Sequence, residues 1–393
     1  MTKIAPLPLK KIYYYNLGIH TYVQHTIANP PEGYTFLSID DRDRKNKMNA
    51  LRKNKVLAFF YKKIVKRWFN VAPLLQRVYY KPAPAEVDLI LTNGTIIEEQ
   101  RPWILEILDA PHSLGGNDYQ VFIKNIPRFE RALASPFCKR ILVHTEASKK
   151  ECEKYFSSEI IKKIVKITPG IPDPKIRRFY RKHPTTFLLM GSINNPSEFY
   201  IKGGLEALET FSRVARKHPE SKLIVKCFVP SELREKYKIQ QIEIIDRNLS
   251  SEEMHELYMK SDALLMPGHG YYLMAFLEAF SYGLPVISLD TYGVSEFVKN
   301  ELNGFVIRPS EKIPYDDAQY PVSVRSEKFI EAIKTIDQRV IEDLVTATTR
   351  LIEDPALLRR MSSDTLRIFR ERYTIEQKNA QLKKIFNAAL SGA

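Results

Sequence analysis

Short strand-like runs alternate with helical stretches twice along the 393-residue chain, and this double series limits the folds that it can adopt. A Pro/Gly cluster at 169–174 separates the two series. The strands that we expect are 11–15, 34–39, 87–91, 103–108, 140–144 and 164–167 in the first series, and 186–190, 222–227, 242–245, 263–266, 285–288 and 304–307 in the second. Such alternation is typical of mostly parallel sheets with helices on both faces. Since the chain is also too long for one ordinary core, we predict an α/β protein of two domains.

Two helices are predicted at the end of the chain, over 355–372 and 375–390. Apolar residues recur at helical spacing in the second of them, namely Leu382, Ile385, Phe386 and Ala389. This helix therefore has an apolar face to bury, and we expect it to pack against the rest of the protein.

Composition and cysteine usage favour a cytoplasmic globular protein. Hydrophobic residues make up 44% of the chain and charged residues 27%, as in ordinary soluble domains. No apolar run reaches the 18 residues that a membrane-spanning helix requires, and residues 1–11 lack the features of a signal peptide. Cys138, Cys152 and Cys227 have no metal-ligand spacing, so we expect reduced, buried thiols.

The positive charge is concentrated in one basic segment, residues 42–81, which has thirteen Lys or Arg and one acid and so supplies +12 of the net +14. Within it an apolar helical stripe that includes Trp68 faces away from five cations, Lys55, Lys62, Lys63, Lys66 and Arg67. This pattern fits an interfacial helix attracted to anionic membrane head groups. It fits equally a helix that packs its stripe on a sheet and shows its charges to water. No recognition motif accompanies the charge, so we expect no nucleic-acid partner.

Glu278 is the first candidate binding residue. It lies in a predicted helix, 273–282, which is ended by Gly283 and followed by a buried strand. Its neighbours along the chain are apolar, whereas a surface acid usually has polar neighbours. A carboxylate can accept hydrogen bonds from both hydroxyls of a ribose, and this predicts a nucleotide site. The alternative is an ordinary solvated acid on a helix.

Lys202 is the second candidate. With Gly203 and Gly204 it follows the strand 186–190 and a polar loop, and it precedes a helix predicted over 205–217. Glycines at a helix start let backbone N–H groups approach an anion, and a lysine adds a positive charge. The order of strand, loop, Lys-Gly and helix therefore indicates a phosphate site.

From about Arg140 to the C-terminus the chain resembles the family 4 glycosyltransferases, which are retaining enzymes of the GT-B fold. The resemblance rests on ordered segments, namely 141–148, 165–171, Lys202-Gly203, the Leu-Glu-Ala to Pro-Val-Ile stretch 277–287, 292–296, Asn303-Gly304 and the closing helices. It implies two Rossmann-like domains that face each other across a cleft. The implied acceptor-side domain is 1–168 plus a returning helix, 375–393, and the implied donor-binding domain is 169–374.

The family's site residues carry over onto particular positions. By this resemblance Glu278 binds the nucleotide ribose, and Lys202 binds the diphosphate and takes part in catalysis. His112 resembles the catalytic histidine that faces the transferred sugar, and Gly18 a glycine near the donor phosphates. No cofactor or metal is implied, and the donor is a nucleoside diphosphate sugar of the UDP or GDP type. The run 41–43 has the pattern Asp-x-Asp, but we interpret it as a solvated turn.

Two positions depart from the family pattern. The family pairs its lysine with an arginine after the loop glycine, where this chain has Ser192, so half of the diphosphate charge is missing unless another cation reaches in. The first carboxylate of the family's Glu-x7-Glu motif falls on Gly270. A one-residue deletion would place His269, Gly270 and Tyr271 there, so that His269 contacts the sugar hydroxyls and the backbone amides of 270–273 contact the rest. The identity of the sugar is left open.

The resemblance implies a reaction and leaves two alternatives. The reaction is transfer of a hexosyl group, with retention, to a glycan, a lipid-linked acceptor or another surface-polysaccharide acceptor, while Lys202 and helix N-termini stabilise the leaving diphosphate. Ser192 and Gly270 motivate one alternative, a GT-B nucleotide-sugar-binding protein that has lost catalysis. The basic segment motivates the other, a protein that binds membrane surfaces. We expect a cytoplasmic location, and docking on the inner face of the membrane stays open.

Overall fold

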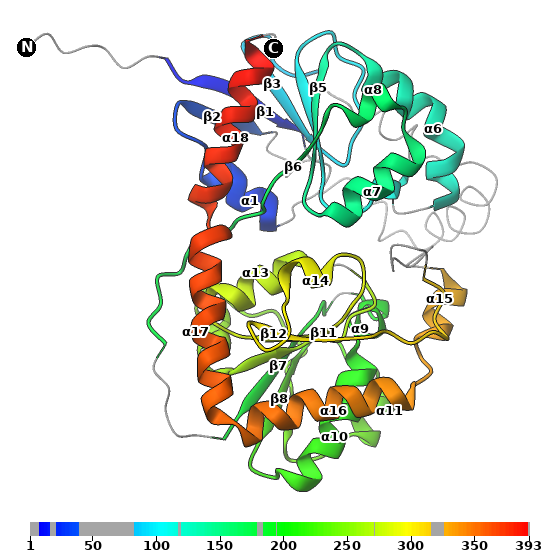
Figure 1. Cartoon of the computed structure of the whole chain (residues 1–393), viewed down its shortest axis with the longest axis vertical. Coiled ribbons are helices and arrows are strands. Elements are labelled where there is room, and N and C mark those ends of the chain that lie inside the picture. Colours follow the sequence, from blue (N-terminus) through cyan, green and yellow to red (C-terminus); the bar gives the residue numbers. More distant parts are fainter. Residues whose placement is uncertain are drawn as a thin grey trace, which may run out of the picture. The chain divides into compact units, whose positions relative to one another are not determined.

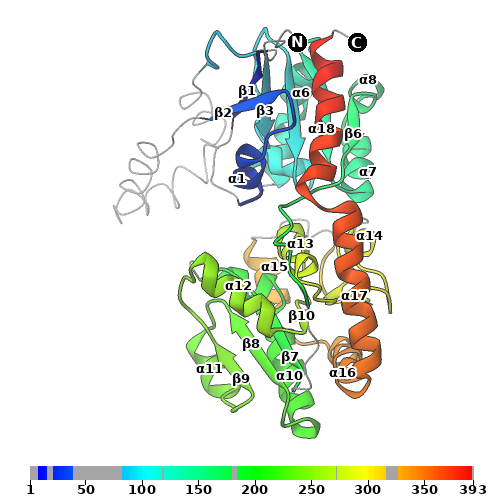
Figure 2. The ribbon, with the colours of Figure 1, turned by 90° about the vertical axis from the view of Figure 1, so that its left-hand side faces the viewer.

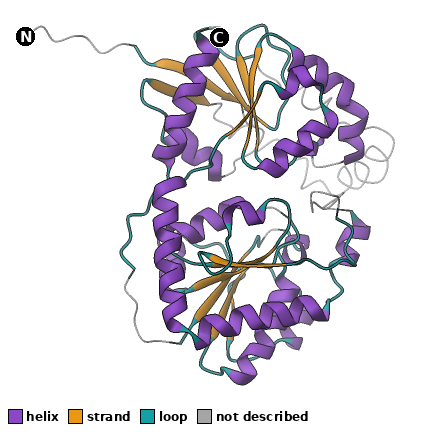
Figure 3. Cartoon of the chain, in the orientation of Figure 1, coloured by secondary structure: helices purple, strands orange, loops and turns teal. Residues whose placement is uncertain are grey.

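The computed structural model describes residues 8–15, 21–38, 82–116, 119–178, 184–193, 195–270, 272–315 and 326–391. The basic segment lies outside these ranges, and so do the predictions for Gly18, Tyr271, Lys55, Lys62, Lys63, Lys66, Arg67 and Trp68. The described residues form two compact units. Unit 1 takes its residues from 1–144, 148–167 and 378–393, and unit 2 from 145–147 and 168–377. In each of them a sheet is flanked by helices (Figures 1 and 3).

Unit 1 is built on a six-stranded parallel sheet in the order β2-β1-β3-β4-β5-β6. Its strands are β1 (Lys10–Tyr15), β2 (Tyr34–Ser38), β3 (Leu89–Asn93), β4 (Trp103–Ile107), β5 (Cys138–Val143) and β6 (Ile164–Lys166). Its helices are α1 (Thr21–Ala28), η2 (Pro111–Gly115), α6 (Tyr119–Ala134), α7 (Glu146–Tyr155), α8 (Ser158–Ile161) and α18 (Ile375–Leu390). The first residues of α7, and the residues of α18 that precede Lys378, belong to unit 2.

Both faces of this sheet are buried. Successive residues of a strand point to opposite sides and so enter different cores. One core contains Tyr13 and Tyr15 of β1 with residues of α6 and α7. The other contains Ile12 and Tyr14 of the same strand with residues of α1 and α18. Leu382, Phe386 and Ala389 of α18 are buried in this second core, which confirms the apolar face predicted for that helix. Figure 2 shows α18 lying against the strands of unit 1.

Unit 2 has a second parallel sheet, in the order β12-β11-β10-β7-β8-β9. Its strands are β7 (Thr186–Met190), β8 (Lys222–Lys226), β9 (Ile242–Ile244), β10 (Ala263–Leu265), β11 (Val286–Leu289) and β12 (Gly304–Ile307). The chain builds outward from β7 through β8 to β9 and then crosses to β10 on the other side of β7. All twelve predicted strands are present, with ends within two residues of those expected.

The helices of unit 2 cover its sheet. They are α9 (Ser197–Ile201), α10 (Gly204–Lys217), α11 (Ser231–Lys236), α12 (Ser251–Lys260), α13 (Leu273–Ser281), α14 (Val294–Phe297), α15 (Glu327–Ala332), α16 (Gln338–Glu353) and α17 (Pro355–Arg372). The start of α17 follows from its sequence, because the Asp354 side chain accepts from the Leu357 N–H and Pro355 stands at the first helical position. Among the described helices, none is both long and apolar enough to cross a membrane.

Candidate functional site

The loops after β7 and β10 meet at the carboxyl ends of their strands. Gly203, the N-cap of α10, has φ 74°, and a Cβ there would lie 2.1 Å from the carbonyl oxygen of Pro267. Only glycine fits this close approach. Because the strand order reverses between β7 and β10, this is the switch point at which ligands bind in open α/β sheets. Lys202, directly before Gly203, therefore lies at the expected binding edge of unit 2.

The Lys202 ammonium is partly withdrawn from water. Its Nζ lies 5.2 Å from the ring centroid of Tyr272, within the range of a cation–π contact. The Tyr272 hydroxyl donates to the carbonyl oxygen of Ile201 at 3.2 Å, which holds the ring beside the lysine. Burial lowers the pKa of Lys202, although the carboxylates of Glu198 and Glu278 act to raise it. A desolvated cation of this kind favours binding of an anion.

Glu278 lies in α13, the helix that follows β10. The Tyr258 hydroxyl donates to its Oε2 at 2.7 Å, and the Tyr258 ring stacks on that of Tyr282 with centroids 4.9 Å apart. Burial raises the pKa of Glu278, while Tyr258, Lys202 and Lys226 act to lower it. Its Oε1 has no hydrogen-bond partner among the described residues. The carboxylate is thus held in place by one oxygen and has the other available.

The start of α13 adds backbone donors to the same edge. Tyr272 is its N-cap and supplies no side-chain hydrogen bond, and its first turn contains no acidic residue. The first N–H groups of a helix have no acceptors within the helix, and the helix dipole favours an anion beside them. Lys202, Glu278 and the N-terminus of α13 therefore form a candidate anion and nucleotide site.

The structure buries His269, for which the sequence predicts a sugar contact. The residue is 1% exposed. Its Nδ1 lies 2.6 Å from the Tyr315 hydroxyl and its Nε2 2.8 Å from Oε1 of Glu206. His269 therefore ties the loop after β10 to α10 and to the segment that contains Tyr315. A sugar contact would require one of these hydrogen bonds to open, and it stays a prediction.

The other predicted donor-side residues contribute main-chain contacts. The Gly270 carbonyl accepts from the Thr291 hydroxyl at 3.2 Å. The Ser192 carbonyl accepts from the Phe228 N–H at 3.1 Å. These bonds fix the loops after β10 and β7, and the Ser192 side chain brings no cation.

His112 lies in unit 1, in the turn η2 that follows the carboxyl end of β4. It is 5% exposed, and its Nδ1 is 3.7 Å from Oε1 of Glu151. The glycine-rich turn after it is closely packed, because a Cβ on Gly115 would lie 2.6 Å from the Phe122 nitrogen. His112 is therefore a well-supported side chain at the strand edge where ligands bind in parallel sheets.

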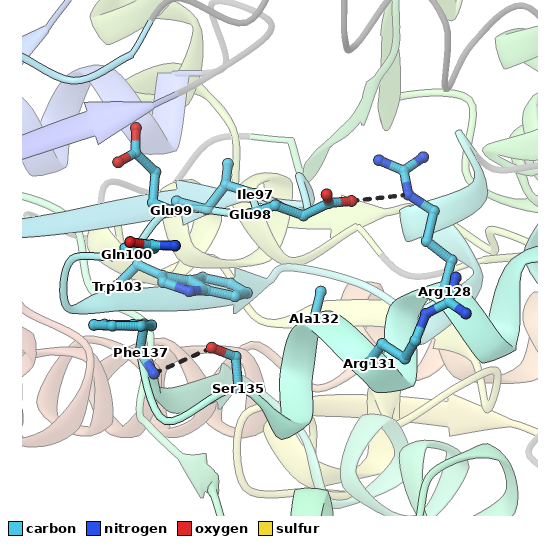
Figure 4. Close-up of a pocket in the computed structure, with 10 residues that line it drawn as sticks. All are labelled: Ile97, Glu98, Glu99, Gln100, Trp103, Arg128, Arg131, Ala132, Ser135 and Phe137. Atoms are coloured by element: carbon cyan, nitrogen blue, oxygen red, sulfur yellow. Dashed lines mark hydrogen bonds and ion pairs between the residues drawn. The ribbon is translucent and has the colours of Figure 1, made fainter.

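A pocket of about 620 Å³ lies at the opposite edge of the unit 1 sheet (Figure 4). It is lined by Trp103, the first residue of β4, and by Phe137, which directly precedes β5. Two of its charged side chains pair with each other, since Nε of Arg128 lies 3.3 Å from Oε1 of Glu98. Because it opens at the amino ends of the strands, we assign it no part in the site.

Two further observations complete the site. The described residues contain no group of three or more His, Cys, Asp or Glu side chains that could hold a metal ion. Lys226, which no sequence motif indicates, acts electrostatically on both Lys202 and Glu278. A lysine at the end of a strand belongs to no motif, and only the pairing of β8 with β7 places it near the loop that carries Lys202.

Comparisons with known proteins show a family match in unit 2 and structural matches along most of the chain. Residues 184–318 match the family model described as Glycosyl transferases group 1. None of the curated proteins matches the sequence. A glycosyltransferase from Rickettsia africae ESF-5 matches with a TM-score of 0.59 and 13% identity, over 99% of this chain and 100% of that one. Anabaena Alr3699/HepE in complex with UDP and glucose matches with a TM-score of 0.59 and 12% identity, over 97% of this chain and 100% of that one. Sucrose-phosphate synthase from Thermosynechococcus elongatus matches with a TM-score of 0.55 and 15% identity, over 78% of this chain and 75% of that one.

The family match falls on unit 2, where it spans β7 to β12 and includes Lys202 and Glu278. The two parallel α/β units are those of the GT-B fold, which the structural matches show. Residues 184–318 therefore form a domain of the glycosyl transferases group 1 type.

Proposed function

We propose that the chain is a retaining glycosyltransferase that takes a hexosyl group from a nucleoside diphosphate sugar of the UDP or GDP type. The observation that carries this proposal is the pair of partly desolvated opposite charges, Lys202 and Glu278, at the switch point of unit 2. The similar fold of Alr3699/HepE, which was solved with UDP and glucose, supports a donor of this class.

In this proposal Glu278 binds the ribose. Tyr258 occupies one carboxylate oxygen, so the other accepts a hydrogen bond from a ribose hydroxyl. Lys202 and the first N–H groups of α13 bind the diphosphate, which places a charge and backbone donors on the same group.

The transfer breaks the bond between the anomeric carbon and the diphosphate oxygen and forms a bond from that carbon to the acceptor oxygen. The acceptor hydroxyl gives its proton to the leaving diphosphate on the same face of the sugar, which retains the configuration. Negative charge grows on the diphosphate during this step, and Lys202 stabilises it. His112 is proposed to bind the transferred sugar from unit 1. No metal is needed, so transfer should continue after EDTA treatment.

The acceptor is proposed to be a glycan, a lipid-linked sugar or another surface polysaccharide. The basic segment, 42–81, supports an acceptor or membrane surface that is anionic, since it concentrates +12 of charge. Location on the inner face of the membrane is part of the same proposal.

A panel of nucleotide sugars tests the proposal. Thermal stabilisation by one nucleoside diphosphate and its sugar, followed by transfer to an acceptor, is the expected result, and NMR of the product should show the donor's anomeric configuration. Inversion would overturn the retaining mechanism. Binding of a nucleotide sugar without transfer of its sugar to an acceptor or to water would favour the alternative, a binding protein that has lost catalysis.

A further inference from the structure

Lys226 is fixed at the carboxyl edge of the unit 2 sheet. It is the last residue of β8, and its Cα pairs with that of Met190, the last residue of β7. The N–H of Gly191 donates to the Lys226 carbonyl oxygen at 2.8 Å. The side chain therefore starts beside the loop that leads from β7 to Lys202.

The loops after β7 and β8 approach each other closely. A Cβ on Gly191 would lie 2.5 Å from Cβ of Cys227, and Phe228 donates its N–H to the Ser192 carbonyl. These contacts hold the main chain on both sides of Lys226. The lysine is therefore a fixed part of this edge and not a residue of a loose loop.

Two lysines bring positive charge to this edge. The ammonium groups of Lys202 and Lys226 repel each other, and both interact with the carboxylate of Glu278, while that of Glu198 interacts with Lys202. Neither ammonium has a hydrogen-bond acceptor or ion-pair partner among the described residues. Burial lowers the pKa of both lysines, and it also raises the pKa of the adjacent Cys227 thiol to about 12, so the thiol stays neutral. Two partly desolvated ammonium groups without a direct ion-pair partner among the described residues favour a bound anion such as a diphosphate.

We propose that Lys226 is the second diphosphate-binding cation, and that it holds the donor's diphosphate from the β8 side while Lys202 holds it from the side of α10. The proposal rests on the proposed function, since it adds a residue to the same donor site. It supplies the positive charge that Ser192 lacks. Because charge grows on the diphosphate as the sugar leaves, Lys226 should contribute to turnover as well as to binding.

The test is the binding of nucleoside diphosphate and nucleoside to the full chain by calorimetry. Lys226→Met removes the charge and keeps much of the side-chain length. Lys222→Met is the matched control, because Lys222 is exposed at the amino end of the same strand. We expect Lys226→Met to weaken UDP or GDP binding about tenfold or more and to leave uridine or guanosine binding unchanged, while Lys226→Arg restores most of the affinity.

The outcomes separate this proposal from the one on which it rests. If the wild-type chain binds UDP or GDP and Lys226→Met binds it equally well, the proposal for Lys226 is wrong and the donor site stands. An equal loss for diphosphate and nucleoside, with an unchanged thermal transition, would also contradict a phosphate contact. If the folded wild-type chain binds no nucleoside diphosphate, the proposed function fails and the role of Lys226 with it.

Discussion

The Tyr258 hydroxyl donates to Oε2 of Glu278 at 2.7 Å, and the other oxygen of this carboxylate has no partner among the described residues. Tyr258 therefore positions the Glu278 carboxylate in the proposed ribose site. Tyr258→Phe should weaken nucleoside diphosphate binding by roughly threefold to tenfold, since one hydrogen bond to a charged group is lost. Glu278→Gln should weaken it more. Calorimetry on both variants checks this order, and a larger loss in Tyr258→Phe would contradict it.

The pH dependence of binding should follow from the same contacts. Burial raises the pKa of Glu278, so protonation should remove its acceptor as the pH falls, at a higher pH than for an ordinary carboxyl. The hydrogen bond from Tyr258 acts in the opposite direction, so Tyr258→Phe should move this acid limb to higher pH. Comparing the two proteins removes the titration of the nucleotide itself. If affinity falls at the same acidic pH in both proteins, protonation of Glu278 does not cause the loss of binding.

Gly203→Ala should abolish nucleotide binding. The residue has φ 74°, and the new Cβ would lie 2.1 Å from the Pro267 carbonyl oxygen, so the loops after β7 and β10 would have to separate. Gly33→Ala is the control, because Gly33 has φ 85° but no atom within 4 Å of a Cβ. The control measures only the cost of placing an alanine in the left-handed backbone region, about 1 kcal/mol. Thermal unfolding and calorimetry compare the variants, and equal effects would refute a tight contact at Pro267.

A buried ionic network fastens α18 to unit 1. Glu106 of β4 is 1% exposed and accepts from the hydroxyls of Tyr14 at 2.8 Å and Tyr22 at 3.1 Å. Lys378 of α18 is 0% exposed, donates to the Thr26 hydroxyl at 2.6 Å, and lies 3.8 Å from the centroid of the Tyr22 ring. Burial lowers the pKa of Lys378 to about 8. Burial opposes ionisation of Glu106 too, but Lys378, His144 and Tyr14 lower its pKa to about 2.

Removing one charge of this network should destabilise unit 1 by roughly 3–5 kcal/mol, because the other charge stays buried without its partner. Glu106→Gln and Lys378→Met each test this, and the double variant should lose less than the sum of the two. Urea unfolding can be followed by Trp103 of β4 in a Trp68→Phe background, since the chain has two tryptophans. Additive losses would show that the two groups do not interact.

The two pKa shifts also set the pH dependence of stability. The pKa of Glu106 is about 2 in the folded protein against an ordinary 4.5, so its contribution is present above pH 4.5 and is lost between about pH 4.5 and 2. The pKa of Lys378 is about 8 against 10.5, so folding releases a proton and this group should make stability rise between about pH 8 and 10.5. The difference between wild type and Lys378→Met isolates the alkaline effect, and a flat difference there would contradict it.

Membrane docking by the basic segment predicts salt-sensitive binding to anionic vesicles. Replacing Lys62, Lys63, Lys66 and Arg67 by Gln removes four positive charges and should release the protein at low salt, since each well-placed cation contributes about 1 kcal/mol. Co-sedimentation with anionic and neutral vesicles measures this. Equal recovery of the wild-type chain with both kinds of vesicle would exclude electrostatic docking.

Local sequence patterns predicted the strands well, and long-range partners not at all. Buried parallel strands read as continuous apolar runs, so β7 and β11 were recognisable without knowing their neighbours. The pairing of Met190 with Lys226 depends on the order of strands, which no local pattern contains. The pair of Glu106 and Lys378 joins residues that lie far apart along the chain. His269 looked like a sugar ligand by position alone, whereas its burial depends on Glu206 and Tyr315.

The central claim is that Glu278 binds a nucleotide ribose, and paired changes in ligand and protein test it most directly. The dissociation constants of a nucleoside diphosphate and its 2′,3′-dideoxy analogue are measured for wild type and Glu278→Gln. We predict that the analogue binds wild type about tenfold more weakly or worse, and that this difference largely disappears in Glu278→Gln, because the carboxylate and the hydroxyls act on each other. An undiminished difference in Glu278→Gln would contradict the claim.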